Sequence, residues 1–182
     1  MNNNLINEFR DYKLSVINGD TKFTISQKNI DKFEDVLNFI SDKLPNDIIS
    51  GSLALNLYGL LNRETNDIDI LIEDKSRYNR YNKSAYDPEV STPNRLGYIN
   101  FNYKKGIFNS EKKYEVDFFL NDYDATFTTF QFKGKTIKIH NPLEIMDYKM
   151  NMTLSVKSDK SVVRKHTNDL MGIFNTIKLL KG

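Results

Sequence analysis

The side chains best suited to chemistry in this 182-residue sequence are two aspartates separated by a single residue, Asp67 and Asp69. Residues 67–72 alternate between polar and apolar side chains before becoming fully apolar, which predicts a strand that enters a core. Residues two apart on a strand face the same side, so both carboxylates project together, away from Ile68 and Ile70. Mg²⁺ prefers one or two protein carboxylates together with waters and substrate phosphates. The pair therefore predicts a site for Mg²⁺ and a phosphate-bearing substrate.

This spacing alone is weakly specific, because a chain with 16 aspartates yields such pairs by chance. Asp122 and Asp124 repeat it in a predicted turn, and we interpret them as part of a solvated loop. Gly51 and Ser52 distinguish the first pair, since they form a small-residue turn between a predicted strand and a predicted helix. Backbone N–H groups at such a turn can receive phosphates. The alternative for this turn is an ordinary N-capped helix after a strand.

Two further features support a site around the pair. Arg63 and Thr65 lie just before Asp67, where an arginine can offset the charge of a phosphate. Asp117 lies among aromatic and aliphatic residues on a predicted strand, and a carboxylate buried there needs a cation or hydrogen-bond donors. We predict that Asp117 belongs to the metal site. A structural salt bridge, or an exposed strand face shared with Glu115, is the alternative.

The elements that must position these side chains are strands and helices of ordinary length. A strand at 47–49, a helix at 53–58 and the strand at 67–72 form the first unit. Aromatic and β-branched residues predict further strands at 97–103, 113–120, 126–132 and 136–139. We expect an α+β (mixed α/β) fold, with a small, mixed, mostly antiparallel sheet flanked by helices.

Both ends of the chain also carry recognisable patterns. Asn18 and Gly19 separate two β-prone segments and predict a hairpin within an N-terminal extension of residues 1–30. Pro142 begins a predicted helix, and apolar spacing over 162–180 predicts a final amphipathic helix, so residues 142–182 form C-terminal helices. Residues 75–95 are predicted to be a long loop or irregular helix. No repeat or linker divides the chain, and we expect a single domain over residues 1–182.

The composition excludes several classes of protein. The chain has no cysteine and two histidines, which excludes disulfides, thiolate chemistry and iron–sulfur clusters and leaves carboxylates as the metal ligands. It has no apolar run long enough for a transmembrane helix and no signal-peptide pattern, so we expect a cytoplasmic protein without a membrane partner. The net charge is +2, but residues 130–182 hold 10 Lys+Arg against 4 Asp+Glu. That basic third either faces a phosphate-bearing ligand or is an ordinary solvated helix surface.

With these residues in place, the sequence resembles the DNA polymerase β-like nucleotidyltransferase superfamily. The superfamily signature is an apolar residue, Gly-Gly or Gly-Ser, a helix, Asp-apolar-Asp and a distant third acid. In this chain the matching residues are Ile49, Gly51, Ser52, Asp67 and Asp69, and residues 63–69 match the Arg-x-Thr-x-Asp-apolar-Asp pattern. The chain is most similar to the small minimal and abortive-infection toxin-type nucleotidyltransferases, with a slightly longer gap between Ser52 and Asp67.

The resemblance continues into the basic third of the chain. Lys149 lies where the toxin-type proteins carry a lysine on the first C-terminal helix. Residues 164–170 are similar to their Arg-x-Lys-Asp-x-x-Asp-Leu stretch, in which Lys165 matches the lysine. Both lysines are therefore implied to approach the nucleotide. His166 stands where that stretch carries its first Asp, so it receives no role.

The resemblance implies transfer of a nucleoside monophosphate from a nucleoside triphosphate to an acceptor hydroxyl, with release of pyrophosphate. Asp67 and Asp69 would bind Mg²⁺, and Asp117 would complete a second metal position and help to deprotonate the acceptor. The residues implied to bind the nucleotide are Gly51, Ser52, Arg63, Thr65, Lys149 and Lys165.

The acceptor is left open by the sequence. A tRNA 3′ end, a protein hydroxyl and a small molecule are all compatible, and the aromatic and basic residues Tyr78, Arg80, Tyr81 and Lys83 favour a nucleic acid. A non-catalytic nucleotide- or nucleic-acid-binding module of the same fold, similar to an antitoxin, is the alternative to an enzyme. The nucleotide base and the oligomeric state also stay open.

Overall fold

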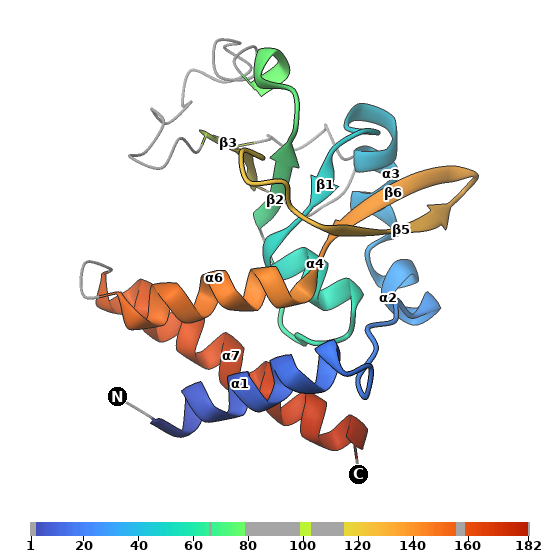
Figure 1. The fold of residues 1–182 in the computed structure, drawn as a ribbon. Coiled ribbons are helices and arrows are strands. Elements are labelled where there is room, and N and C mark those ends of the chain that lie inside the picture. The colour runs from blue at the N-terminus through green and yellow to red at the C-terminus, as the bar shows by residue number, and fades with distance from the viewer. Residues whose placement is uncertain (1–2, 66, 79–98, 103–114, 156–158, 182) are drawn as a thin grey trace.

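A computed structural model describes residues 3–65, 67–78, 99–102, 115–155 and 159–181 (Figure 1). A helical turn at residues 75–78 begins the segment predicted as a long loop or irregular helix, and residues 79–98 lie outside the described residues. In chain order the elements are α1 (Asn3–Ile17), α2 (Gln27–Lys32), α3 (Glu34–Lys43), β1 (Ile48–Ile49), α4 (Gly51–Leu57), β2 (Asp67–Ile72), β3 (Ile99–Asn102), β4 (Glu115–Leu120), β5 (Phe127–Phe132), β6 (Lys135–His140), α6 (Pro142–Leu154) and α7 (Lys160–Lys181).

The strands form one six-stranded sheet in the order β3-β4-β2-β1-β6-β5. β1 pairs with β6 and β2 pairs with β4 in parallel, whereas the other three neighbouring pairs are antiparallel. Helices flank this sheet, so the predicted α+β class with a mixed, mostly antiparallel sheet is confirmed. The strands predicted at 126–132 and 136–139 are present as β5 and β6, with ends shifted by one residue. β3 and β4 fall within the strands predicted at 97–103 and 113–120, of which residues 97, 98, 103, 113 and 114 lie outside the described residues.

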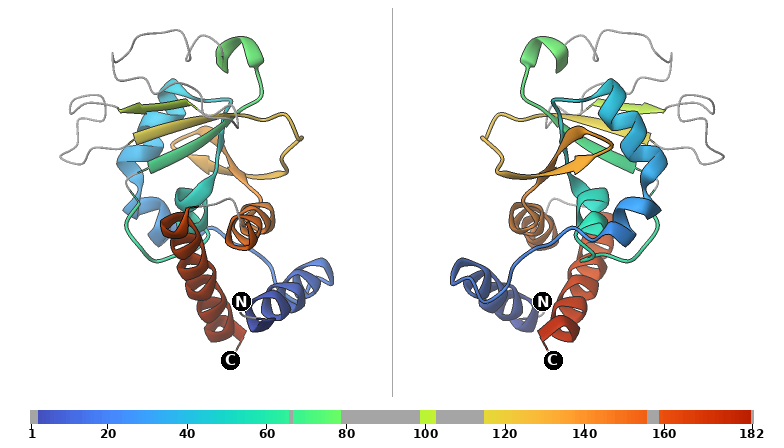
Figure 2. Two further views of the ribbon diagram at one scale, coloured as in Figure 1. Left: turned by 90° about the vertical axis from the view of Figure 1, so that its left-hand side faces the viewer. Right: turned by 90° about the vertical axis from the view of Figure 1, so that its right-hand side faces the viewer.

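One face of the sheet packs into the main core. The neighbouring strand residues Ile49, Ile70, Phe118 and Ile139 form a row across four strands, and none of them has exposed surface. Helices α3 and α4 supply buried side chains to the same core, and Figure 2 shows α3 running along the sheet. Each fully buried side chain of this size stabilises the fold by roughly 1.5–3 kcal/mol. Because strand residues alternate in direction, the residues next to this row face the opposite side.

The N-terminal hairpin prediction is wrong, because residues 3–17 form the helix α1. Leu5, Phe9 and Tyr12 recur at helical spacing and are buried. The ring centroids of Phe9 and of Phe174 in α7 lie 6.2 Å apart. Gly19 has a positive φ of 81°, which a tight hairpin turn would also require, but it ends a helix instead of joining two strands. The N–H groups of Gly19 and Asp20 donate to Val16 and Ser15, the pattern of a glycine C-cap.

The C-terminal helices agree with the prediction. Asn141 caps α6 by accepting a hydrogen bond from the Leu143 N–H group, and Pro142 occupies the first helical turn. α6 and α7 pack against each other below the sheet, and α1 lies against α7 (Figure 1). Within the described part of the chain, no helix is both long and apolar enough to span a membrane.

Candidate active site

A row of four polar side chains crosses the sheet on the face opposite the core. Asp69 of β2 is the register partner of Asp117 of β4. Continuing the β1 register one residue past its end places Ser50 beside Asp69, and the Ser50 N–H group donates to the Asp69 carbonyl at 2.8 Å. The same continuation places Ser50 beside His140 of β6. Neighbouring strands lie roughly 4.8 Å apart, so these four residues occupy adjacent positions on one face.

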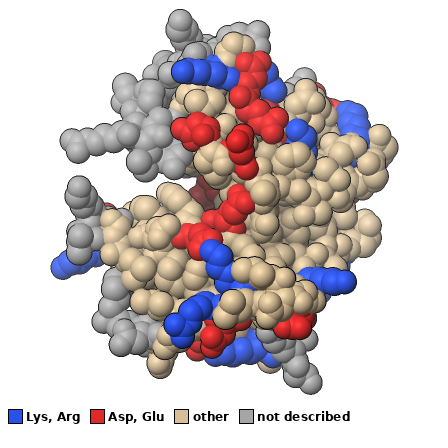
Figure 3. All heavy atoms as spheres, viewed as in Figure 1, with Lys and Arg blue, Asp and Glu red and all other residues tan. Residues whose placement is uncertain are grey.

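This row lines a cavity of about 710 Å³. The sheet forms one wall and the helices α6 and α7 form the other, and Figure 3 shows acidic side chains gathered around the hollow between them. The cavity is large enough for a substrate of nucleotide size. The predicted site residues that line it are Gly51, Ser52, Asp67, Asp69, Asp117, Lys149 and Lys165.

Asp69 fits its position because residue 51 has no side chain. A Cβ atom added to Gly51 would lie 1.5 Å from Asp69 Oδ2, and the φ angle of Gly51 is +58°, which favours glycine. The backbone of Ser52 also donates a hydrogen bond to the Asp69 carboxylate. Burial, followed by the charge of Asp67, raises the pKa of Asp69 to about 6. The turn at Gly51 therefore holds a carboxylate that gains from a nearby positive charge.

The donor set on this face suits a hard divalent cation. Asp67 and Asp69 face the same side of β2 and offer only oxygen atoms. Among the described residues, no three His, Asp or Glu side chains lie close enough together to hold one ion. A cation here would thus be held by the two β2 carboxylates, with its other positions left to water and phosphate, which is the arrangement that Mg²⁺ prefers. Asp117 shares the cavity with this pair.

A buried ion cluster centred on Asp169 of α7 lies against the cavity, which two of its members, Ser52 and Lys149, line. Arg63 donates to both oxygens of Asp169, at 2.8 and 3.1 Å, and also to the Ser52 hydroxyl at 2.8 Å. The Lys149 Nζ atom of α6 lies 2.8 Å from Asp169, and both of these side chains are 4% exposed. Burial lowers the pKa of Lys149. Burial by itself would raise the pKa of Asp169, but the hydrogen bonds and positive charges of Arg63 and Lys149 outweigh burial and lower that pKa. The cluster fixes α6 and α7 to the turn that carries Ser52.

Arg63 and Thr65 do not themselves line the cavity. Arg63 is committed to Asp169, and the Thr65 hydroxyl donates to the Asp67 carbonyl at 3.0 Å. Both residues therefore position the start of β2 and the Gly51–Ser52 turn. Their predicted direct contact with a nucleotide stays a prediction.

The helix wall of the cavity carries Lys165, His166 and Tyr148. The Lys165 Nζ atom lies 3.4 Å from Asp67 Oδ2 across the cavity. Burial, followed by the charge of Lys149, lowers the pKa of His166 to about 4, so its imidazole is neutral at physiological pH. Its ring meets that of Tyr148 edge to face with 6.0 Å between centroids. A cation and an aromatic pair thus face the carboxylates.

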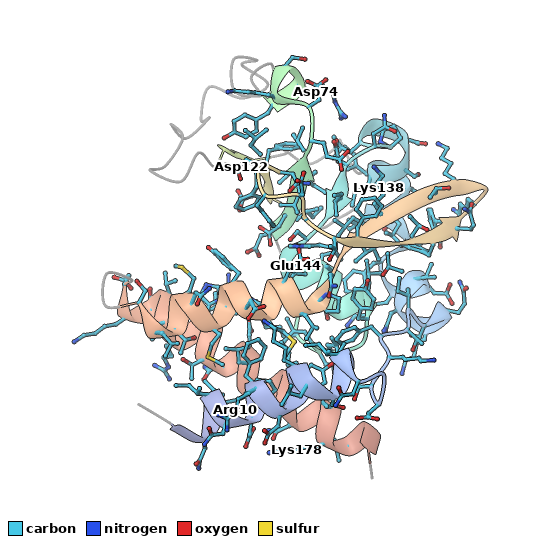
Figure 4. All side chains as sticks on the ribbon, in the orientation of Figure 1. Arg10, Asp74, Asp122, Lys138, Glu144 and Lys178 are labelled. Carbon is cyan, nitrogen blue, oxygen red and sulfur yellow. The ribbon has the colours of Figure 1, made fainter. Side chains whose placement is uncertain are left out.

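A second set of polar contacts joins Ser50, His140 and Glu144, which all line the cavity. Ser50 Oγ lies 2.8 Å from His140 Nδ1, and His140 Nε2 lies 2.9 Å from Glu144 Oε2. Figure 4 shows Glu144 at the start of α6, on the side of the helix toward the sheet. Local sequence patterns could not predict the contact between Ser50 and His140, because it depends on the parallel pairing of β1 with β6.

The sequence does carry a signal for the structural role of Asp169. It lies next to Leu170 and one turn before Ile173 on the apolar face of α7, all of them buried. Lys149 similarly lies between the buried Met146 and Met150 of α6. A charged residue on the buried face of each of two adjacent helices indicates an ion pair between them.

Comparison with known proteins gives only distant likenesses. No protein-family model matches the chain, and no curated protein matches it in sequence. An antigenic nucleotidyltransferase-like protein from Paracoccidioides brasiliensis is similar in structure, with a TM-score of 0.45 and 20% identity, over 82% of this chain and 77% of that one. JHP933 from Helicobacter pylori is similar with a TM-score of 0.38 and 18% identity, over 75% of this chain and 61% of that one.

Proposed function

We propose that this protein is a nucleotidyltransferase that moves a nucleoside monophosphate from a nucleoside triphosphate to an acceptor hydroxyl and releases pyrophosphate. The observation that carries the proposal is the placement of Asp67, Asp69 and Asp117 along one wall of a cavity whose other wall presents Lys149 and Lys165. Carboxylates alone would repel a triphosphate, and cations alone would bind any anion. Both together suit a triphosphate that arrives with a divalent cation.

Each side chain has a distinct task in this proposal. Asp67 and Asp69 hold Mg²⁺, which when bound polarises the phosphate oxygens and offsets their charge. Lys165, which is half-exposed at the cavity, binds the phosphates directly. Asp117 accepts the proton of the acceptor hydroxyl as the acceptor oxygen bonds to the α-phosphorus and the bond to pyrophosphate breaks.

The remaining surface of the cavity suits a nucleoside. Aromatic rings provide flat surfaces on which a base stacks, and such stacking tolerates different bases. The aromatic residues that line the cavity are Tyr78, Phe119, Tyr123 and Tyr148. Of the residues proposed to favour a nucleic-acid acceptor, Tyr78 is buried at this cavity, whereas residues 80, 81 and 83 lie outside the described residues.

The proposal is tested by incubating the protein with Mg²⁺ and each α-labelled nucleoside triphosphate, together with total RNA and cell protein. We expect label in one fraction, reduced by roughly 1000-fold in Asp69→Asn, because the metal contributes several kcal/mol to the transition state. Asp122→Asn is the matched control, since Asp122 lines the same cavity from an exposed loop outside the aspartate row. Wild-type transfer by Asp69→Asn would overturn the proposal. Mg²⁺-dependent nucleotide binding without label in any fraction would favour a non-catalytic binding module.

A further inference from the structure

Ser50 has an unusual position for a serine at the start of a helix. It is the N-cap residue of α4, yet its hydroxyl makes no capping hydrogen bond to that helix. Ser26, the N-cap of α2, shows the ordinary behaviour, since its hydroxyl accepts a hydrogen bond from the Asn29 N–H group. The Ser50 hydroxyl instead lies 2.8 Å from His140 Nδ1, and both residues are buried. Its hydrogen bond is therefore made to an imidazole beside the cavity.

The protonation of His140 follows from its second partner. Glu144 accepts hydrogen bonds from the Thr126 N–H group and hydroxyl as well as facing His140 Nε2. Although burial opposes them, these hydrogen bonds lower the pKa of Glu144, so its carboxylate is ionised and acts only as an acceptor. His140 Nε2 consequently carries the proton, and burial keeps the imidazole neutral by lowering the His140 pKa. His140 Nδ1 is then the acceptor, and Ser50 is the donor.

This arrangement gives Ser50 the features of an activated nucleophile. An imidazole that accepts the hydroxyl proton, and is itself oriented by a carboxylate, is the general pattern for raising the reactivity of serine. A position between a strand and a helix also suits a nucleophile, because the end of the strand opens onto the substrate cavity. Ser50 follows β1 directly, precedes α4 and lines the cavity.

The residues around Ser50 determine which kind of electrophile its hydroxyl can attack. Ser50 lies beside Asp69 on the adjacent strand, its N–H group donates to the Asp69 carbonyl, and Gly51 touches the Asp69 carboxylate. The anionic intermediate of an acyl transfer would be repelled by the aspartates of this wall. A phosphate group bound through a cation at Asp67 and Asp69 is attracted to the same wall. The site therefore favours phosphorus over an acyl carbon.

We propose that Ser50 is itself an acceptor, so that the protein attaches a nucleoside monophosphate to its own Ser50 hydroxyl. This inference rests on the proposed nucleotidyl transfer in the same cavity. Ser50 Oγ bonds to the α-phosphorus, the hydroxyl proton passes to His140 Nδ1, and the bond to the pyrophosphate leaving group breaks. The product is a phosphodiester between Ser50 and the nucleotide. Because that nucleotide then occupies the cavity beside Asp69, the modification blocks further transfer to other acceptors.

The experiment is intact-mass measurement of the full chain after incubation with Mg²⁺ and each nucleoside triphosphate, followed by peptide mapping of the wild type. We expect a gain of one nucleoside monophosphate, located by fragmentation at Ser50. Ser50→Ala loses this gain, and His140→Gln slows it by roughly 100-fold or more, as expected when a general base is removed. Ser26→Ala is the matched control, because it removes a helix N-cap serine that does not line the cavity. We expect Ser26→Ala to be modified like the wild type.

Other outcomes separate this inference from the proposed function. Modification of the wild type at a residue other than Ser50 would overturn the inference, and so would an unmodified protein that transfers label to RNA or to another protein. In both of these cases the proposed nucleotidyl transfer stands. Absence of label from the protein and from every added acceptor, with no release of pyrophosphate, would overturn both. Because the wild-type map locates the nucleotide by itself, the test does not depend on how well Ser50→Ala folds.

Discussion

The contact between Gly51 and Asp69 is the tightest constraint at the scale of single residues. Gly51→Ala must place a Cβ atom where the Asp69 carboxylate now lies and must hold alanine at a φ of +58°. We expect it to displace the carboxylate, to abolish nucleotidyl transfer and to destabilise the fold by more than the roughly 1–2 kcal/mol that a left-handed alanine costs. Urea unfolding and the transfer assay measure the two effects.

Gly134 provides the matched control for that substitution. It has a φ of +76° in the turn between β5 and β6, and a Cβ atom there would meet nothing within 4 Å. Gly134→Ala should therefore show the backbone cost alone and keep the transfer activity. Equal destabilisation by the two variants, with activity kept in both, would contradict the account of Gly51.

Asp69 also predicts a dependence of stability on pH. Its pKa in the folded protein is about 6, raised by burial and then by Asp67. Folding thus favours the protonated form, so the stability contributed by Asp69 is present below about pH 4 and is lost as the pH rises through about 6. The Asp69→Asn variant has no carboxyl proton to lose at this position. Its free energy of unfolding should therefore increase relative to that of the wild type over that pH interval. Urea midpoints of both proteins in EDTA measure this difference, and a constant difference would contradict the pKa assignment.

At the scale of elements, the buried cluster around Asp169 joins the first turn of α4 to both C-terminal helices. Asp169→Asn leaves Arg63 and Lys149 close together without a carboxylate. We expect a loss of roughly 3–5 kcal/mol in unfolding free energy, as for other buried pairs broken on one side. Chemical denaturation at neutral pH measures it.

The control for the cluster is an ion pair that also joins two helices. Glu8 of α1 lies 3.0 Å from Lys178 of α7, with side chains 39% and 61% exposed. Glu8→Gln should cost less than about 1 kcal/mol, because water screens exposed pairs. A loss for Asp169→Asn as small as that for Glu8→Gln would show that the cluster does not fix the helices.

The elements also show which features the sequence could predict. Alternation in residues 67–72 and the proline at 142 predicted β2 and the start of α6, since both signals are local. Asn18 and Gly19 predicted a hairpin wrongly, because a glycine with a positive φ serves a helix C-cap equally well. The row of Asp117, Asp69, Ser50 and His140 depends on strand pairing between distant segments. Local patterns carry no information about that pairing.

Over the whole molecule, the cavity brings charges of opposite sign together. The sheet presents aspartates, and the helices of the basic third of the chain present Lys149 and Lys165 beside the acidic Glu144 and Asp147. α1, α6 and α7 pack together below the sheet and hold the lysine wall in place (Figure 1). We infer that this arrangement of aspartates and lysines serves a triphosphate with its divalent cation.

The most direct test of that claim is anomalous diffraction from crystals grown with Mn²⁺ and a nucleoside triphosphate analogue that resists cleavage between the α- and β-phosphates. Mn²⁺ takes the same hard oxygen ligands as Mg²⁺ and is visible by its anomalous signal. We predict a peak between the Asp67 and Asp69 carboxylates, with phosphate oxygens completing the coordination and Lys165 turned toward the phosphates. A nucleotide and ion bound elsewhere, or a cavity that stays free of both at saturating concentrations, would contradict the account.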